Sequence, residues 1–530
     1  MTAIITFYAR WLERGMRRPA VLGLACIVLI AIGGISYKFL GSDLLPAMDE
    51  GGFILDYIMP AGSSLAETDR VLRHVEKILH DTPEVETTSR RTGLQMGLAA
   101  VTEANTGDLT VKLKNKRNRA IDDVIADVRA QIKEKEPELD IEFIQVLQDM
   151  IGDLSNSPEP IQIKVFNEDP TVLANVAPRI ADTIKKENGV VDVLNGIENT
   201  ISGPATTFQI NPANATRLGF SAEEISTDTT ALIEGVEAPE PVINTGRAYP
   251  VRIRFGPQYR DSLDTITGTV FNSQTGRTAT LGSLADIQQL PGQPEIRREN
   301  LQRLVSVTGR LEGSDLGTAI KRVQAAVTAL HLPPQVRITY GGTYEEQQKS
   351  FHELLRVLIL ALVLVFGVLL AEFRNFSAPT AILASSVLSI TGVVFALLVT
   401  NTSFNVASFM GVIMVIGIVA KNGILLLDAE QKFLAQGMSP FDAIVHAGRR
   451  RLRPILMTAL AAITGMLPLA FALGAGSQML QPLAIAVIGG LLISLVLSLI
   501  VTPTVYYVLT RKAHPSSLET EELAEELSRT

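Results

Sequence analysis

Apolar residues are distributed very unevenly along the chain. A membrane crossing by an α-helix takes about 20 predominantly apolar residues. Six runs approach or exceed that length, one near the start and five in the last third, at about 20–40, 354–371, 379–400, 404–427, 454–473 and 480–509. The pattern predicts an α-helical membrane protein with six transmembrane helices and one large extramembrane domain between the first and second runs.

The polar region 41–350 alternates between the period of a strand and the period of a helix. Four strand–helix–strand units are expected, at 53–59, 64–80 and 85–89; at 109–113, 120–133 and 141–146; at 161–166, 172–186 and 190–193; and at 304–308, 316–330 and 336–340. Such βαβ repeats favour an α+β fold with helices on one face of each sheet. Residues 199–300 are richer in Thr, Gly and Pro and are typical of an inserted module of strands and loops.

Basic residues predict the orientation of the spans. Residues 1–18 form an amphipathic segment containing four arginines, which suits a helix lying in the membrane interface. The positive-inside rule then places both termini in the cytoplasm and the large domain outside. A cleaved signal peptide is the rival interpretation of the first apolar run. The expected division is 1–18 interfacial helix, 19–40 span, 41–198 extramembrane units, 199–300 inserted module, 301–350 completion of the last unit, 351–510 five spans and 511–530 acidic cytoplasmic tail.

Composition excludes several classes of function. The 530 residues include one cysteine, Cys26, so neither a disulfide framework nor a cysteine zinc site can form within the chain. No nucleotide-binding glycine motif, catalytic motif or basic nucleic-acid stripe is present. We therefore expect no enzyme activity, no cofactor and no metal site. A chain of this kind that moves a substrate uphill would have to use an ion gradient.

One lysine, Lys421, interrupts the apolar run 404–427 and is followed by Asn422. An ionisable side chain in hydrocarbon costs roughly 2.5–3.5 kcal/mol on insertion scales, so it needs a partner or a function. Snorkelling toward the interface is the structural alternative. The functional alternative is an ammonium facing a carboxylate on another helix. Acidic residues stand only at span edges, at Glu372 and Asp428, so the sequence predicts half of a proton relay whose acid comes from elsewhere.

An arginine cluster precedes the run that begins at Pro454. Its members, Arg449, Arg450, Arg451 and Arg453, are expected to fix topology, although Arg451 or Arg453 could turn inward at the start of a helix beginning at Pro454. Thr458 could hydrogen-bond toward the same interior.

Three stretches carry a resemblance to a known family. IVAKNGILLLD (418–428) and RRRLRPILMTALAAITGMLPLAF (449–471) resemble the carboxyl-terminal half of a resistance–nodulation–division (RND) efflux pump, and LLPAMDEGGFILDYIMPAGSSLAET (44–68) is similar to the opening of its second periplasmic loop. The resemblance covers nearly the whole chain. It implies spans seven to twelve of a twelve-span pump, ferredoxin-like porter subdomains, and a docking subdomain at 199–300.

The resemblance also implies functional residues and partners. Lys421 matches the transmembrane lysine of the proton relay, with Asn422, Arg451 and Thr458 around it. Residues 92–107 lie where the family has a switch loop that substrate passes, which makes Gly93, Leu98 and Ala99 candidate substrate contacts. The family's paired aspartates lie in the first half and have no counterpart here. Implied partners are membrane lipid, a complementary half carrying those aspartates, a trimeric assembly, a periplasmic adaptor and an outer-membrane channel.

The expected function is half of a proton-driven exporter of drugs or other amphiphiles in a bacterial inner membrane, with its large domain in the periplasm. One alternative is a heavy-metal RND exporter, for which a soft-metal path would want clustered thioethers, whereas Met48, Met59, Met96 and Met150 are widely spaced. Another is a membrane-anchored interaction subunit, or an inactive fragment, without transport of its own.

Overall fold

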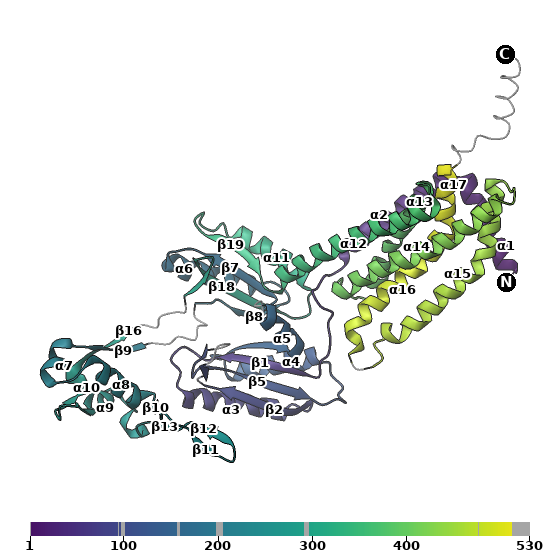
Figure 1. Ribbon diagram of the computed structural model, residues 1–530. Helices are drawn as coiled ribbons and strands as arrows, with labels where there is room; N and C mark the ends of the chain where they lie inside the picture. Colours follow the sequence, from purple (N-terminus) through teal and green to yellow (C-terminus); the bar gives the residue numbers. More distant parts are fainter. Residues whose placement is uncertain are drawn as a thin grey trace, which may run out of the picture.

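The computed structural model describes residues 2–93, 95–96, 101–155, 159–197, 205–290, 296–474 and 476–510. A helical bundle forms one side of the molecule and sheet-containing units form the other (Figure 1). The predicted acidic tail, 511–530, lies outside the described residues. The elements at the two chain ends, α1 and α17, lie at the end of the bundle far from the sheets (Figure 1).

The first α+β unit is a four-stranded antiparallel sheet with strand order β2-β5-β1-β6. The strands Gly52–Ile58, Val85–Thr92, Thr106–Leu113 and Asp140–Gln145 are β1, β2, β5 and β6, and its helices are α3 (Leu65–Asp81) and α4 (Ile121–Lys135). Alternate residues Phe53, Leu55 and Tyr57 of β1 are fully buried against the two helices, as a one-sided strand requires. The Ser64 hydroxyl accepts a hydrogen bond from the Glu67 amide and so begins α3.

The second α+β unit repeats this order of strands. Its sheet runs β17-β18-β7-β19, and β8 also pairs with β18. Its elements are β7 (Ile161–Phe166), α6 (Pro170–Ile184), β8 (Val190–Leu194), β17 (Arg297–Glu299), β18 (Gln302–Leu311), α11 (Leu316–Ala329) and β19 (Arg337–Gly341). A strand, a helix and a strand therefore stand at each of the four places where the sequence predicts them.

A separate module interrupts the second unit between β8 and β17. Its first and last strands, β9 (Ala205–Ile210) and β16 (Ala285–Leu290), pair along their whole length and close it off. Between them lie α7 (Pro212–Leu218), α8 (Ala222–Ile233), β10 (Val236–Glu237), β11 (Val242–Asn244), β12 (Arg247–Tyr249), β13 (Arg252–Ile253), α9 (Leu263–Gly268), β14 (Val270–Asn272), β15 (Thr278–Thr280) and α10 (Leu281–Leu284). The module has its own core around Phe220, Leu232 and Phe271. Three short elements complete the first unit, namely β3 (Gln95–Met96), β4 (Val101–Thr102) and α5 (Val146–Ser155).

Six helical stretches of the described chain are long and apolar enough to cross a membrane: Pro19–Phe39, Thr343–Phe373, Ser377–Val399, Val406–Leu434, Pro440–Ala470 and Ser477–Thr510. The first five are α2, α12, α13, α14 and α15. The sixth contains α16 (Gln481–Val496), a π-helical turn at Leu497–Val501 and α17 (Thr502–Thr510). The amphipathic helix α1 (Thr2–Arg17) packs Tyr8, Leu12 and Met16 against this bundle. Gly392 and Gly489 allow α13 and α16 to touch, since a Cβ at Gly489 would lie 2.5 Å from the Gly392 carbonyl oxygen.

Two predictions about the ends of spans are wrong. Helix α14 continues to Leu434, and α15 begins at Pro440 with Ser439 as its cap. Pro454 therefore lies inside α15, and the arginine cluster is helical and does not precede a helix start. The apolar runs underestimate the lengths of α14 and α15, because each helix continues as an amphipathic helix beyond the part that is compatible with hydrocarbon.

The linker that follows α2 joins the second unit to the bundle. Ser42 forms a parallel bridge with Phe404, just before α14. The Asp43 carboxylate accepts a 2.8 Å hydrogen bond from the Leu316 amide, and the Asp315 carboxylate accepts a 2.9 Å bond from the Ser42 amide. The start of α11 and the start of α14 are thus fixed to one short segment.

Candidate functional site

Lys421 lies on a face of α14 that no described residue covers. The exposed residues Met410, Met414, Gly417 and Lys421 recur at intervals of four, three and four, which places them on one stripe of the helix. A Cβ built on Gly417 would meet nothing within 4 Å. No salt bridge joins Lys421 to a carboxylate within the described part of the chain, so the structure gives this lysine no acidic partner. We call this surface the Lys421 stripe.

The other three predicted relay residues take up different environments. Asn422 points into the bundle and is 4% exposed. The Arg451 guanidinium lies 3.5 Å from the Asp428 carboxylate, and the exposed Thr458 hydroxyl donates to the Ile455 carbonyl of its own helix. Arg451 is therefore paired with an acid at the end of α14, and the structure does not bring Thr458 into contact with Lys421.

Sequence reasoning missed one residue of the bundle, Glu430. It follows the apolar run 404–427 in the sequence, yet it lies within α14 and is 2% exposed. The acid therefore lies in the extension of α14 beyond the apolar run, where it is nevertheless buried. The available signal was helical spacing, because Gly423, Leu427 and Glu430 follow one face at intervals of four and three.

The predicted switch loop is only partly described. Gly93 ends β2 with φ of +102°, a backbone conformation that favours glycine, and a Cβ there would meet the Leu65 side chain at 3.4 Å. Leu98 and Ala99 lie outside the described residues.

A row of charged residues crosses the face of the first sheet that is turned away from its helices. Asp56 on β1 is the register partner of Asp108 on β5 and of Glu142 on β6, and Asp108 is the partner of Arg91 on β2. Cross-strand partners share one face with Cβ atoms about 4.5–5.5 Å apart. We call Asp108, Asp56 and Glu142 the carboxylate row.

Arginines occupy both ends of the carboxylate row. Arg91 lies 2.8 Å from Asp108 at the exposed end, and Arg310, on β18 of the second unit, lies 3.7 Å from Glu142 at the buried end. Burial raises the pKa of Glu142 from 4.5 to about 7; Arg310 opposes this shift, and Glu159 and Asp56 add to it. The Glu142 Oε1 atom is buried and has no hydrogen-bond partner among the described residues. The positive charge of Arg310 therefore does not fully offset the burial of the Glu142 carboxylate.

A second ionic contact joins the two α+β units. Arg129 of α4 binds Asp192 of β8 through Nε and Nη2 at 3.0–3.1 Å, and Asp192 is completely buried at its side chain. Arg129 also contacts Glu312 and lies over the Phe143 ring at 4.9 Å. A cavity of about 920 Å³ adjoins this contact, and its lining includes Asp122, Arg129 and Glu312 together with the ends of α13 and α16.

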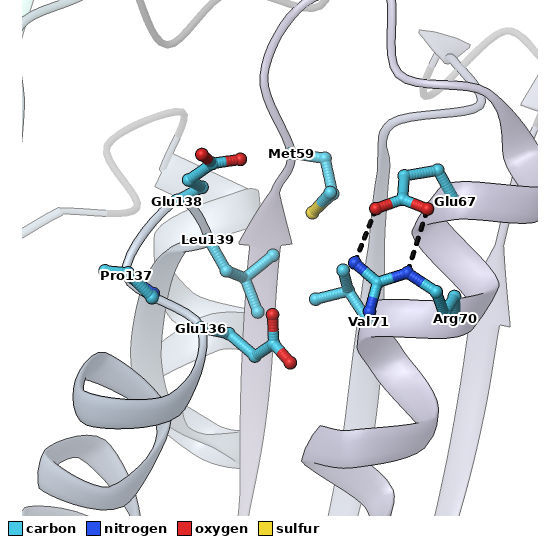
Figure 2. Close-up of a pocket in the computed structure, with 8 residues that line it drawn as sticks. All are labelled: Met59, Glu67, Arg70, Val71, Glu136, Pro137, Glu138 and Leu139. Atoms are coloured by element: carbon cyan, nitrogen blue, oxygen red, sulfur yellow. Dashed lines mark hydrogen bonds and ion pairs between the residues drawn. The ribbon is translucent and has the colours of Figure 1, made fainter.

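A smaller pocket of about 260 Å³ opens beside Met59 at the end of β1, between α3 and the segment after α4 (Figure 2). Three glutamates surround it, but Glu67 is held by two hydrogen bonds from Arg70 and Glu136 by His74. Met59 is buried in the core of the first unit, whereas Met150 on α5 is 56% exposed. Across the described residues, no three His, Cys, Asp or Glu side chains converge closely enough to hold a metal ion.

Comparison with known proteins gives consistent matches over nearly the whole chain. The family described as AcrB/AcrD/AcrF matches residues 1–510. The nickel-cobalt-cadmium resistance protein NccA of Alcaligenes xylosoxydans xylosoxydans is 28% identical over 95% of this chain and 48% of its own length. The cobalt-zinc-cadmium resistance protein CzcA of Cupriavidus metallidurans is 27% identical over 99% of this chain and 50% of its own.

A crystal structure of a heavy metal efflux pump superposes with a TM-score of 0.81 at 26% identity, covering 96% of this chain and 52% of that one. The chain thus spans about half the length of the curated relatives it matches. In each comparison the similarity extends over both the bundle and the α+β units.

Proposed function

Because the chain belongs to the AcrB/AcrD/AcrF family, we propose that it forms half of a proton-driven RND exporter of divalent metal ions. The relatives named for nickel, cobalt, zinc and cadmium resistance support metal export, the alternative in the sequence analysis, over export of drugs. They give no support to a role in multidrug resistance. The carboxylate row is the structural observation that carries the proposal.

The chemistry of the row suits divalent cations better than amphiphiles. An amphiphile site is lined mainly by apolar and aromatic side chains, whereas this face presents Asp108, Asp56 and Glu142 in adjacent positions. Oxygen ligands bind divalent first-row ions with affinity that rises from manganese toward nickel and copper. A soft monovalent ion would need clustered thioethers, and Met59 is committed to a hydrophobic core. Because the row runs from the exposed Arg91 end to the buried Glu142 end, an ion moving along it would contact one or two carboxylates at a time.

Metal tolerance of bacteria producing this chain with a complementary half tests the substrate class. Asp56→Asn should lower tolerance to nickel, cobalt and zinc and raise the metal content of the cells, because it removes the central charge of the row. Asp264→Asn is the matched control, since Asp264 is an exposed carboxylate of the inserted module. Equal tolerance in both variants would contradict metal transit along the row. Altered tolerance to amphiphilic compounds without a change for metals would favour drug export.

The Lys421 stripe supports the half-pump part of the proposal. An exposed ammonium in a membrane span is costly unless another helix supplies a partner, and small Gly417 allows close approach. A complementary half carrying a transmembrane carboxylate would cover the stripe. Lys421→Ala should abolish export, whereas Lys432→Ala, on the same helix and paired with Asp428 at 2.8 Å, should leave it unchanged. Export by the Lys421→Ala form would remove the relay role.

The remaining parts of the assembly follow from the same proposal. The two α+β units serve as ferredoxin-like porter subdomains in the periplasm, and the inserted module serves as a docking subdomain. Both termini lie in the cytoplasm of a bacterium, and the complete pump is a trimer with an adaptor and an outer-membrane channel. A subunit without transport is the competing function, and proton-coupled metal flux by the reconstituted two-half complex distinguishes the two.

A further inference from the structure

Glu430 is an acid without a compensating charge inside the helical bundle. It lies nine residues after Lys421 on α14, about 13 Å along the helix axis at 1.5 Å per residue. Its residue is 2% exposed and its Oε2 atom is buried with no hydrogen-bond partner in the described structure. Unlike Lys421, it faces the interior of this chain and needs no second half to bury it.

Several charged groups on the surrounding elements have partners other than Glu430. On α14 itself, Asp428 binds both Lys432 and Arg451. On α15, Arg449 lies 3.8 Å from Glu13 of α1, and Arg450 lies over the Phe433 ring. On α1, Arg17 lies over the Phe441 ring. No ion pair to Glu430 is formed by any described residue, and Tyr506 of α17 lies close enough to interact with it electrostatically.

The protonation state of Glu430 follows from its burial. Transferring an ionised carboxylate from water to an apolar interior is far more costly than transferring the neutral acid, so an unpaired buried carboxyl takes up a proton. Leu427, Ile444 and Tyr506 belong to the buried apolar cluster of this part of the bundle, and none of the three carries a positive charge.

A pair of hydrogen-bonded hydroxyl groups is buried in the same bundle. Tyr506 stands one turn after Thr502, whose hydroxyl donates a 2.7 Å hydrogen bond to the Ser385 hydroxyl of α13. Both Thr502 and Ser385 are at most 1% exposed. One turn before Ser385 lies Ile382, which packs directly on Gly423, the residue after Asn422. The buried Thr502–Ser385 pair thus lies on helices α17 and α13, and α13 packs through Ile382 on the part of α14 that carries Asn422.

We infer that Glu430 is a proton-binding site of this half, located at the end of the bundle that carries α1 and α17. Uptake forms an O–H bond at the Glu430 carboxyl, and release breaks it, leaving a carboxylate and passing the proton to water at that end of the bundle. The assignment rests on the proposed function only for its direction, which would be toward the cytoplasm. It gives this chain an acid of its own, separate from the acid expected from a complementary half.

Infrared difference spectroscopy on the full chain in lipid vesicles tests this assignment. At neutral pH the wild-type spectrum should contain a protonated-carboxyl band that Glu430→Gln abolishes. Asp428→Asn is the matched control, because Asp428 is a half-exposed acid of the same helix with two cationic partners, and it should leave that band in place. Backbone hydrogen exchange of both variants checks that the bundle remains folded.

The opposite result is equally clear. If the difference between wild type and Glu430→Gln at neutral pH contains carboxylate bands in place of the protonated-carboxyl band, Glu430 is ionised and the inference is wrong. The spectroscopic measurement requires no transport. If the protonated-carboxyl band is found but the two-half complex shows no metal flux, the proton site stands and the proposed function is wrong. If metal flux is found but the band is absent, the proposed function stands and the proton site is wrong.

Discussion

Removing Arg129 should loosen the contact between the two α+β units. Its guanidinium belongs to α4 of the first unit and binds Asp192 of β8 in the second. The Asp192 side chain has no exposed surface. Arg129→Met keeps much of the aliphatic volume but leaves that carboxylate without its main cation.

The size of the effect follows from what remains around Asp192. Breaking a buried ion pair by removing one partner typically costs about 3–5 kcal/mol, because the other charge stays buried. Lys133 lies 3.3 Å from Asp192 but is half exposed, so it replaces only part of the lost interaction. We therefore expect the lower end, about 3 kcal/mol. Because about 1.4 kcal/mol corresponds to a factor of ten in an equilibrium constant, the equilibrium constant for opening of the contact should rise roughly hundredfold.

Amide hydrogen exchange of the full chain, followed on α4 and β8, measures this opening. Arg129→Met should exchange faster in both elements, and Asp192→Asn added to it should recover most of the loss because the orphan charge disappears. Asn also tolerates the left-handed backbone at this position, where φ is +48°. The control Arg70→Met removes an exposed pair with Glu67 and should change nothing measurable. Equal exchange in Arg129→Met and Arg70→Met would refute the reasoning, as would a double variant as open as the single one.

Three further predictions concern pH, helix packing and capping. The folded state binds the Glu142 proton more tightly than the unfolded chain, so the free energy of unfolding should fall as pH rises from 4.5 to about 7. Amide hydrogen exchange on β6 should become faster over this pH range, beyond the intrinsic pH dependence of exchange. The Glu142→Gln variant should lack this change in stability. Gly489→Leu should prevent stable folding, judged by detergent thermal unfolding, because the side chain would enter α13; Gly417→Leu should leave the chain folded but reduce its copurification with a complementary half. Asp315→Ala should cost about 1–2 kcal/mol, since it removes the α11 cap and the bond to the Ser42 amide, and faster exchange at the start of α11 would report it.

Periodicity was sufficient to predict the α+β units. Strand β1 of the first sheet buries alternate residues, so the pattern Phe53, Leu55 and Tyr57 carries a clear signal. The helices that cover the sheets bury one stripe each, which gives an equally clear period of 3.6. Pairing between distant strands could not be predicted, because register depends on contacts that no local pattern specifies. The carboxylate row exists only through that pairing.

Hydropathy predicted the number of spans but not their ends. A run of apolar residues reports the part of a helix compatible with hydrocarbon, and α14 and α15 both extend past it as amphipathic helices. Glu430 was missed for this reason, since a single acid after an apolar run resembles the start of a loop. The stripe containing Lys421 was equally invisible in composition, because exposure depends on which faces of α14 the neighbouring helices occupy.

Helix α14 links the membrane residues Lys421 and Glu430 to the carboxylate row of the first sheet. Its first turn is held by a capping box between Asn405 and Ser408, and the preceding Phe404 exchanges backbone hydrogen bonds with Gly41 and Asp43 of the linker. The same linker holds the start of α11 in the second unit, whose Arg310 faces Glu142. A displacement of α14 caused by a change of charge at Lys421 or Glu430 must therefore either break these bonds or move the second unit with it. Movement of the second unit would change the distance between Arg310 and the carboxylate row.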